Sequence, residues 1–361
     1  MLNLKACPCS QLKNNLDNKM IVCFGAGRNF LNFLRKNTNI KTKIKCIIDN
    51  DDRLNGTIIE DIPVYSLKKF ITQCDKNFIL MITSSLYWMD ILKQLDDIDF
   101  FNEISCYVNF INENMVEHSN YSLLTGENKI PKVIHYCWFG NKKIPDHLMK
   151  YINTWEKFCP EYKIIRWDES NYDVSKNKYM RQAYEAGKYG FVPDYARLDI
   201  IKQYGGIYLD TDVELVKNLD SLLCYEFYCG FESEHYVALG LGFGAVKEHP
   251  LLDKMLEVYE NLNFVENGVI NDTASPHYQS PVIKEQGFLL NGRYQEKNGI
   301  GILPCEILAP GAGSIFPDCI TENTYSIHHY DASWVENRDE YKRYREDLRK
   351  LYTDRILKMK R

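Results

Sequence analysis

The sequence predicts an α/β protein with parallel sheets, arranged in two successive domains. Apolar strands alternate with amphipathic helices over the first 110 residues, and a second alternation starts at Ile130. Strands that alternate with helices are typical of βαβ units and parallel sheets. We therefore expect a small α/β domain over 1–110, a polar linker over 111–129, a larger α/β domain over 130–334 and an amphipathic helix over 335–361.

Length and composition are those of a globular protein with two or three domains. The chain has 361 residues, of which 45% are hydrophobic and 26% charged. The net charge is −5 and there is no Lys/Arg-rich block, which argues against nucleic acid as a partner. The twelve cysteines are scattered, and Cys7 and Cys9 are too close to read as a zinc half-site, so we expect reduced thiols and a cytoplasmic location.

No segment reads as a signal peptide or as a membrane span. The N-terminus is followed by polar residues, and the longest apolar stretch, Phe78–Met89, is interrupted by Thr83, Ser84 and Ser85. That stretch is also too short to cross a bilayer. Any contact with a membrane is therefore expected to be peripheral.

The first domain opens with a strand and a glycine turn. The strand is Ile21–Phe24, the turn contains Gly25 and Gly27, and an apolar-periodic helix runs through Phe33 and Leu34. Further strands are expected at 44–48 and 78–82. This order predicts a Rossmann-like parallel domain.

The glycine turn partly matches a dinucleotide fingerprint. Asp49 ends the second strand, about where a ribose-binding acid would lie, but Phe30 occupies the third glycine position. That glycine normally permits close packing of helix on strand, so its absence weakens the match. Two hypotheses stay open: the domain binds a nucleotide through Gly25, Gly27 and Asp49, or it is a scaffold that docks other biosynthetic enzymes.

The second domain begins with the strand-like segment Ile130–Gly140. A helix is expected from Pro145 to about Phe158, followed by a strand from Tyr162 to Trp167. A further helix starts near Pro193 and leads through a glycine pair into an apolar strand. These elements extend the alternation of strands and helices.

Four charged residues flank that helix–turn–strand segment. Asp194 and Arg197 are three positions apart, so a helix places them on one face. Gly205 or Gly206 can end the helix in the left-handed conformation and turn the chain into the strand. Asp210 and Asp212 follow at the carboxyl end of that strand, where open α/β sheets bind ligands. Two carboxylates there can hold a hard divalent cation, which in turn can hold a diphosphate.

Four segments in this order resemble glycosyltransferase family 32, the enzymes with a DXD sugar-binding region, many linked to capsular polysaccharide synthesis. The resemblance covers about 130–334. It is carried by the segments Ile130–His135 with Trp138–Gly140, Pro193–Arg197, Tyr204–Asp212, and Tyr325–Tyr330 with Ser333–Trp334.

The resemblance implies a GT-A type nucleotide-sugar-binding domain behind the small Rossmann-like domain. It also implies a nucleotide diphosphate sugar as donor, Mn²⁺ or Mg²⁺, and retention of anomeric configuration. By position, Trp138 would stack on the base, while Asp194 and Arg197 would contact ribose and sugar. Tyr208 falls among the donor-binding positions, and Trp334 would lie against the diphosphate.

The metal ligands implied by the resemblance are Asp210, Asp212 and one histidine. Asp212 would be the main ligand, and Asp210 would contact either the metal or the ribose. Of His328 and His329, the alternation of a strand allows only one to face the site, and we choose His329. Imidazole suits Mn²⁺ better than Mg²⁺.

Further candidate residues lie outside these segments. Glu232 and Glu234 could contact the sugar, and Asp272 and His277 could line the acceptor side. In Gln279-Ser280-Pro281 a serine replaces the glycine that the family often has, which puts the local backbone in doubt. The C-terminal helix carries basic residues that suit either a solvated face or an anionic membrane surface.

The sequence thus predicts a cytoplasmic, metal-dependent, retaining hexosyltransferase. It would act on a glycan or a lipid-linked glycan of the cell surface, docked to other polysaccharide biosynthesis enzymes or peripherally to the inner face of the membrane. Two alternatives stay open: a metal-dependent nucleotidyltransferase, and a non-catalytic protein that binds nucleotides or glycans.

Overall fold

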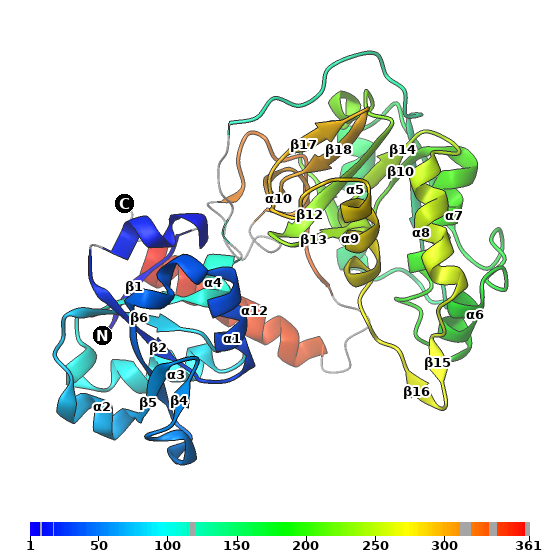
Figure 1. Cartoon of the computed structure of the whole chain (residues 1–361). Helices are drawn as coiled ribbons and strands as arrows, with labels where there is room; N and C mark the ends of the chain where they lie inside the picture. Colours follow the sequence, from blue (N-terminus) through cyan, green and yellow to red (C-terminus); the bar gives the residue numbers. More distant parts are fainter. Residues whose placement is uncertain are drawn as a thin grey trace. The chain divides into compact units, whose positions relative to one another are not determined.

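A computed structural model of the chain describes residues 1–7, 9–16, 18–113, 115, 120–310, 319–331 and 338–357 (Figure 1). The chain divides into two compact units. Unit 1 comprises Met1–Glu117 together with Leu351–Arg361, and unit 2 comprises His118–Lys350. Within the described residues both units are α/β, as the sequence predicts.

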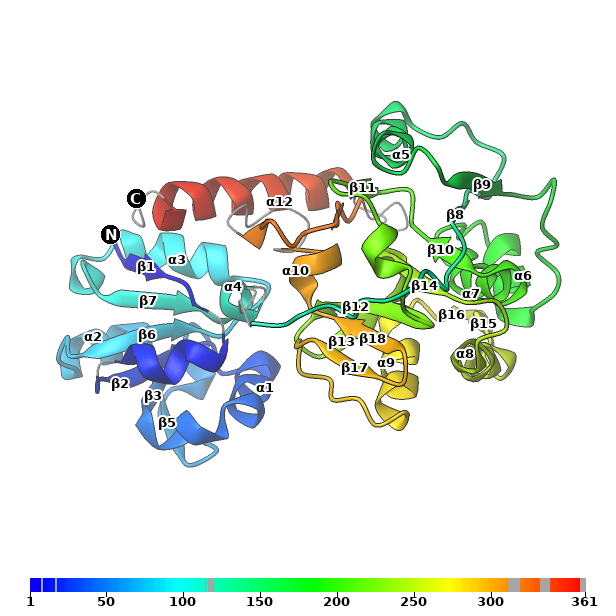
Figure 2. The ribbon, with the colours of Figure 1, turned by 90° about the horizontal axis from the view of Figure 1, so that it is seen from above.

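Unit 1 is built on a seven-stranded sheet in the order β1-β7-β6-β2-β3-β5-β4 (Figures 1 and 2). All neighbouring strands are parallel except β4, which is antiparallel to β5. The strands are β1 (Asn3–Lys5), β2 (Met20–Phe24), β3 (Ile44–Asp49), β4 (Ile58–Ile59), β5 (Ile62–Ser66), β6 (Phe78–Ile82) and β7 (Ser105–Val108). The three strands expected from the sequence are confirmed within two residues.

The connections of unit 1 are short helices. They are α1 (Arg28–Lys36), α2 (Leu67–Gln73), α3 (Trp88–Asp96) and α4 (Asn109–Glu113), with the 3₁₀ turns η1 (Cys9–Leu16), η2 (Thr38–Lys43), η3 (Asp52–Leu54) and η4 (Asp99–Phe101). Phe30 and Phe33 of α1 are fully buried against the sheet. Helix α4, with Ile111 and Asn112 buried, occupies the start of the segment expected to be a linker.

Asp49 holds the glycine turn of unit 1. Its Oδ2 accepts a hydrogen bond from the amide of Ala26 at 2.7 Å, and its Oδ1 accepts one from the amide of Asp51 at 2.8 Å. Gly25 has a φ of 104°, a conformation that favours glycine. Both oxygens of the expected ribose-binding acid are therefore used by neighbouring backbone.

The segment from Leu351 on belongs to unit 1, whereas most of the preceding helix belongs to unit 2. Helix α12 (Arg338–Tyr352) is followed by a turn of π-helix, η8 (Thr353–Leu357), which lies against β1. Arg355 pairs with Asp96 at 2.5 Å and donates to the carbonyl of Leu2 at 2.7 Å. The amide of Leu2 also donates to Asp96, at 2.8 Å. One carboxylate thus joins the two ends of the chain within this unit.

Unit 2 contains a mixed eight-stranded sheet in the order β17-β18-β12-β14-β10-β8-β9, with β13 paired to β12. The strands are β8 (Val133–Cys137), β9 (Lys163–Trp167), β10 (Gly206–Tyr208), β12 (Phe227–Ser233), β13 (Tyr236–Ala238), β14 (Phe243–Ala245), β17 (Gln295–Lys297) and β18 (Ile300–Leu303). Strands β9, β8 and β10 are parallel, and β14 runs antiparallel to β10. Two small sheets pair β11 (Val213–Leu215) with β19 (Ser326–His328), and β15 (Val265–Glu266) with β16 (Val269–Ile270).

Helices pack on the sheet of unit 2 through two separate hydrophobic clusters. The helices are α5 (Asp146–Phe158), α6 (Lys178–Glu185), α7 (Pro193–Tyr204), α8 (Pro250–Glu260), α9 (Pro276–Glu285) and α10 (Cys305–Leu308), with 3₁₀ turns η5 (Asp220–Leu222) and η6 (Leu239–Leu241). Along β10 and the residue after it, Ile207 and Leu209 join the cluster that includes α5, while Tyr208 joins the cluster of α6–α9. This alternation places Tyr208 under α7.

The turn between α7 and β10 has the predicted glycine geometry. Gly205 caps α7 with a φ of 65°, and Gly206 follows with a φ of 107°. A Cβ on Gly206 would lie 2.7 Å from the carbonyl oxygen of Val133. His135 of β8 secures the turn: Trp167 Nε1–H donates to its Nδ1, so its Nε2–H donates to the carbonyl of Gly205, each at 3.0 Å. Burial lowers the pKa of His135 to about 4, which keeps it neutral.

Candidate active site

Two aspartates and a histidine form the centre of the candidate site. Asp210 and Asp212 follow β10, and His328 ends β19. One ligand atom from each of the three lies within 4.8 Å of the others, and His328 Nε2 is 3.2 Å from Asp212 Oδ1. Two carboxylates and an imidazole are a donor set that suits a divalent cation such as Mn²⁺. The residues present therefore fit the metal that the DXD resemblance implies.

The pairing of β11 with β19 determines which histidine reaches the aspartates. His328 lies opposite Val213, directly after Asp212, in this antiparallel pair. The side chain of His329 points elsewhere: its Nε2 lies 2.8 Å from Glu214 Oε2, and its ring stacks on Tyr151 at 4.1 Å. The choice of His329 as the histidine of the metal site is therefore corrected to His328.

Arg197 connects the aspartates to helix α7. Its Nη2 donates to Asp194 Oδ1 at 2.8 Å, and its Nη1 lies 3.7 Å from Asp210 Oδ2. The guanidinium also stacks over the ring of Tyr208, 5.1 Å from its centroid. Asp194 and Arg197 are 5% and 4% exposed, so this is a buried charge network rather than a surface ion pair.

Tyr208 lies behind the site. Its side chain is 1% exposed, and its hydroxyl donates to Asp210 Oδ1 at 3.0 Å. Its ring lies beneath the Arg197 guanidinium, so one tyrosine contacts both charged partners. A tyrosine so deeply buried orients a carboxylate and does not itself present a surface to a ligand.

A glycine turn closes one side of the site. The amide of Asp210 donates to the carbonyl of Gly240 in η6 at 3.3 Å. A Cβ at Gly240 would overlap Asp210 Oδ2 and approach Arg197 Nη1 to 2.9 Å. Only glycine permits this contact between the backbone and the two side chains.

Helix α9 positions that turn. Gln279 Oε1 accepts a hydrogen bond from the amide of Leu239 at 3.0 Å, and Ser280 Oγ accepts one from the amide of Val237 at 3.0 Å. Ser280, which replaces the glycine expected here, is buried, and its hydroxyl group anchors β13.

The electrostatics of the site follow from burial and from these pairs. Burial raises the pKa of Asp194 to about 7, although Arg197 acts against it. Burial also raises the pKa of Asp210, again opposed by Arg197. Burial alone would raise the pKa of Asp212, but the adjacent His328 outweighs it and lowers that pKa.

The segment after β19 folds onto Asp212. The amide of Asp331 donates to Asp212 Oδ2 at 2.8 Å, and the amide of His329 donates to the carbonyl of Asp212 at 2.9 Å. Asp331 Oδ1 lies 3.2 Å from His147 Nε2 on α5. Sequence reasoning missed His147 and Asp331, although Asp331 directly follows the His-His-Tyr string.

The cluster of possible metal ligands contains none of the other predicted residues that the structure describes. Trp138 follows β8, is half-buried, and its Nε1–H donates to the carbonyl of Lys142 at 2.6 Å. Glu232 is half-buried on β12; burial raises its pKa and the nearby His328 lowers it. Glu234 lies 3.9 Å from His235, and His277 packs edge-on against Tyr236. Asp272 is exposed. Trp334 lies outside the described residues.

Comparison with known proteins identifies the region that contains the site. Residues 145–228 match the family described as glycosyltransferase sugar-binding region containing DXD motif. The chain is 29% identical over 163 residues to mannosyl phosphorylinositol ceramide synthase SUR1 of Saccharomyces cerevisiae, covering 43% of this chain and 42% of that protein. It is 34% identical over 141 residues to inositol phosphoceramide mannosyltransferase 3 of Schizosaccharomyces pombe, covering 37% of each.

A solved structure described as PaToxG glycosyltransferase has 21% identity, covers 44% of this chain and 69% of that one, and gives a TM-score of 0.36. The chain spans about two fifths of the length of the two yeast relatives. The matched region begins at the helix after β8 and includes Asp194, Arg197, Asp210 and Asp212. The family match and the yeast relatives support a glycosyltransferase, and the α/β topology around the carboxylate pair is consistent with the expected GT-A type fold.

Proposed function

We propose that this chain is a metal-dependent, retaining glycosyltransferase of the family 32 type. It transfers a hexose from a nucleotide diphosphate sugar to a glycan or a lipid-linked glycan, such as a capsular precursor. The observation that carries the proposal is the Asp210–Asp212–His328 cluster beside the buried Asp194–Arg197 pair, inside a region that matches DXD glycosyltransferases.

Each residue has a distinct role in the proposed reaction. Asp210, Asp212 and His328 would hold Mn²⁺ or Mg²⁺, which when bound supplies positive charge to the diphosphate leaving group. Arg197 adds a fixed positive charge in a buried environment, where it acts more strongly than in water. Asp194 accepts hydrogen bonds from hydroxyl groups of the donor, and Trp138 stacks on the base. Glu232 is the proposed carboxylate near the sugar, which becomes oxocarbenium-like as the bond breaks.

The names of the yeast relatives favour mannose as the hexose and a lipid-linked acceptor. No helix in the described ranges of the chain has the length and apolar character needed to cross a membrane. We place the enzyme in the cytoplasm, at the inner face of the membrane. The exposed basic residues Arg343, Arg349 and Lys350 of α12 would face anionic lipid.

For unit 1 we favour the scaffold hypothesis over nucleotide binding. Both oxygens of Asp49 accept backbone hydrogen bonds, so this carboxylate has a structural role in holding the glycine turn. A nucleotide titration of the full chain carrying Asp212→Ala would report on unit 1 with the proposed metal site impaired.

The first test is a thermal-shift screen of nucleoside diphosphates and nucleotide sugars, with Mn²⁺ and with chelator. A ligand that binds only the folded state raises the midpoint by mass action. We expect a metal-dependent shift with one nucleotide family, release of nucleoside diphosphate from the matching sugar, and loss of both in Asp212→Ala. Release of a nucleoside monophosphate would indicate a nucleotidyltransferase, and metal-dependent binding without turnover a non-catalytic protein.

A further inference from the structure

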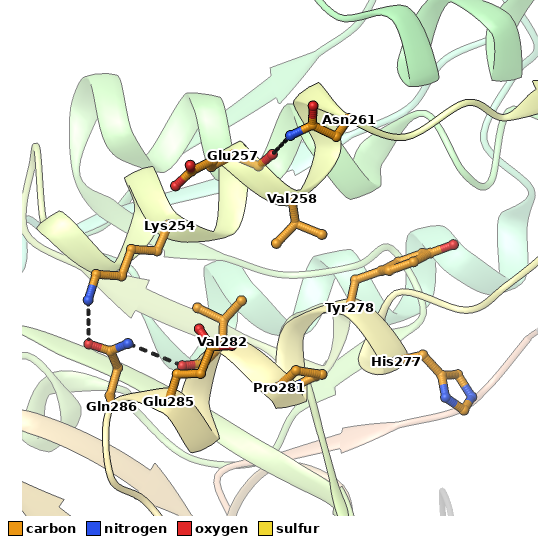
Figure 3. A pocket seen from close by; sticks show the side chains of 10 residues that line it. All are labelled: Lys254, Glu257, Val258, Asn261, His277, Tyr278, Pro281, Val282, Glu285 and Gln286. Carbon is orange, nitrogen blue, oxygen red and sulfur yellow. Dashed lines mark hydrogen bonds between the residues drawn. The ribbon is translucent and has the colours of Figure 1, made fainter.

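A concave surface of unit 2 lies beside α9, the helix that positions the η6 turn. It is an open groove of about 660 Å³ between α8 and α9 (Figure 3). This α8–α9 groove is lined by Lys254, Glu257, Val258, Asn261, His277, Tyr278, Pro281, Val282, Glu285 and Gln286. Its volume falls within the range of about 300–1,000 Å³ that is common for small-molecule sites.

The groove has an apolar floor and a polar rim. Figure 3 shows Val258 reaching from α8 toward Tyr278, Pro281 and Val282 of α9. The rim carries two carboxylates, one ammonium group and two amides. Such a surface can pack against the C–H faces of a sugar ring while its rim hydrogen-bonds the hydroxyl groups.

The rim is held by its own hydrogen bonds. Lys254 Nζ donates to Gln286 Oε1 at 2.8 Å, and Gln286 Nε2 donates to the carbonyl of Val282 at 3.3 Å. Lys254 is therefore tied to an amide, while Glu257 and Glu285 leave the rim with more negative than positive charge. This balance disfavours a phosphate or a nucleotide and favours a neutral, polyhydroxylated ligand.

Helix α9 connects the groove with the candidate active site. Gln279 accepts a hydrogen bond from the amide of Leu239 and Ser280 accepts one from the amide of Val237, so both residues hold the segment that leads to Gly240. Tyr278 lines the groove and directly precedes Gln279. The groove therefore shares helix α9 with the residues that position the turn beside Asp210.

We infer that the α8–α9 groove binds a neutral oligosaccharide, the part of the glycan acceptor that lies beyond the sugar receiving the transferred hexose. The inference rests on the proposed transferase function and names its acceptor class: a chain of several neutral sugars rather than a monosaccharide or an anionic headgroup alone.

The test is binding of neutral oligosaccharides to the full chain. The array contains fragments of mannan, glucan, galactan and N-acetylhexosamine polymers. Each fragment has two to about six units, a length that we choose to exceed one sugar subsite. The fragment that binds best is then titrated by calorimetry. Val258→Trp fills the floor and should weaken binding about tenfold or more, a free-energy loss of about 1.4 kcal/mol. The control is Val269→Trp, which changes an exposed valine of β16 and should leave binding unchanged.

A second pair of variants covers the case in which the tryptophan disturbs folding. Glu257→Gln with Glu285→Gln removes both rim carboxylates and should weaken binding, whereas Glu260→Gln, on α8 outside the groove, should not. Absence of binding to every array fragment, or equal binding by the groove variants and their controls, would overturn the inference. Donor hydrolysis without acceptor separates the two proposals: it should persist in Val258→Trp, and its absence in the wild type would count against the transferase function instead.

Discussion

At the scale of single residues, the candidate site depends on side chains whose charge is set by burial. Asp194 is almost completely enclosed, with Arg197 as its ion-pair partner. A carboxylate in such surroundings is harder to ionise, because little water stabilises its charge. Its ordinary pKa would leave it ionised throughout the physiological range, whereas here it titrates within that range.

This leads to a prediction about pH. Burial raises the pKa of Asp194 to about 7, and only the ionised form maintains a charged pair with Arg197, whose other nitrogen approaches Asp210. We expect kcat/KM for donor hydrolysis to fall as the pH decreases through about 7. Asp194→Asn should lower kcat/KM by about 10²-fold, as for loss of one polar transition-state contact. It should also abolish the fall of kcat/KM at low pH.

The kcat/KM of both proteins is measured at the same metal saturation from pH 5.5 to 8.5, a window chosen to bracket the Asp194 pKa of about 7. If Asp194→Asn keeps the wild-type inflection, another group is responsible. His328 is the alternative to examine then, because the neighbouring Asp212 raises its pKa in spite of burial.

The limits of sequence-based reasoning are clearest for two adjacent histidines. The alternation of a strand correctly required that only one of His328 and His329 face the aspartates, but it did not say which. That parity depends on the register of β19 against β11, which joins residues more than a hundred positions apart. Tyr208 shows a related limit, because its sequence position is equally compatible with a ligand contact and with its observed support of Asp210.

At the scale of elements, the site combines a segment that is continuous in sequence with a turn that distant elements bring to it. The α7–glycine–β10 segment is local, and its glycine cap could be predicted from the sequence. The η6 turn reaches Asp210 only because β12, β13 and α9 carry it there. Nothing in the sequence around Gly240 marks it as part of the site.

Gly240→Ala tests this element directly. The added Cβ would overlap Asp210 Oδ2 and crowd Arg197, so the carboxylate must move. We expect donor hydrolysis to fall by about 10²-fold, since a small misplacement of a catalytic group has effects of that size. The midpoint of thermal unfolding should stay close to the wild-type value.

Gly126→Ala is the matched control for this substitution. Its new Cβ would approach only Cys224 Cβ, at 3.9 Å, which is an ordinary contact. Equal activity of the Gly240 and Gly126 variants would show that η6 does not constrain Asp210.

At the scale of the whole molecule, the division of the chain differs from a simple succession of domains. The sequence suggested an appended helix over 335–361, because its periodicity is local. The structure assigns Leu351–Arg361 to the same unit as the N-terminus, through contacts that span the length of the chain. No local pattern around Arg355 or Asp96 indicates their pairing, whereas the α/β class of each unit follows from local patterns alone.

Arg355→Ala should destabilise unit 1 selectively. It removes the ion pair with Asp96 and the hydrogen bond to Leu2, leaving a partly buried carboxylate without its cation. We expect the free energy of unfolding of unit 1 to fall by about 2–3 kcal/mol. Hydrogen exchange followed by mass spectrometry should show faster exchange in β1 and β7 and no change in β8 or β10.

Arg349→Ala is the control here, because Arg349 is an exposed arginine of α12. Faster exchange of β1 in both variants would point to a general effect of charge on the C-terminal segment. Unchanged exchange in Arg355→Ala would show that the Asp96 pair contributes little to unit 1.

The link between Asp96, Leu2 and Arg355 also has a consequence for biosynthesis. Domains usually fold in order as the ribosome releases them, at about 5–20 residues per second. The sheet of unit 1 is complete once β7 has emerged, yet its last ion pair forms only after Arg355 has been translated and released. Most of unit 2 is therefore translated while the first-made unit still waits for its final partner. A nascent chain that is interrupted before that point carries an incomplete N-terminal unit, which quality-control proteases can recognise.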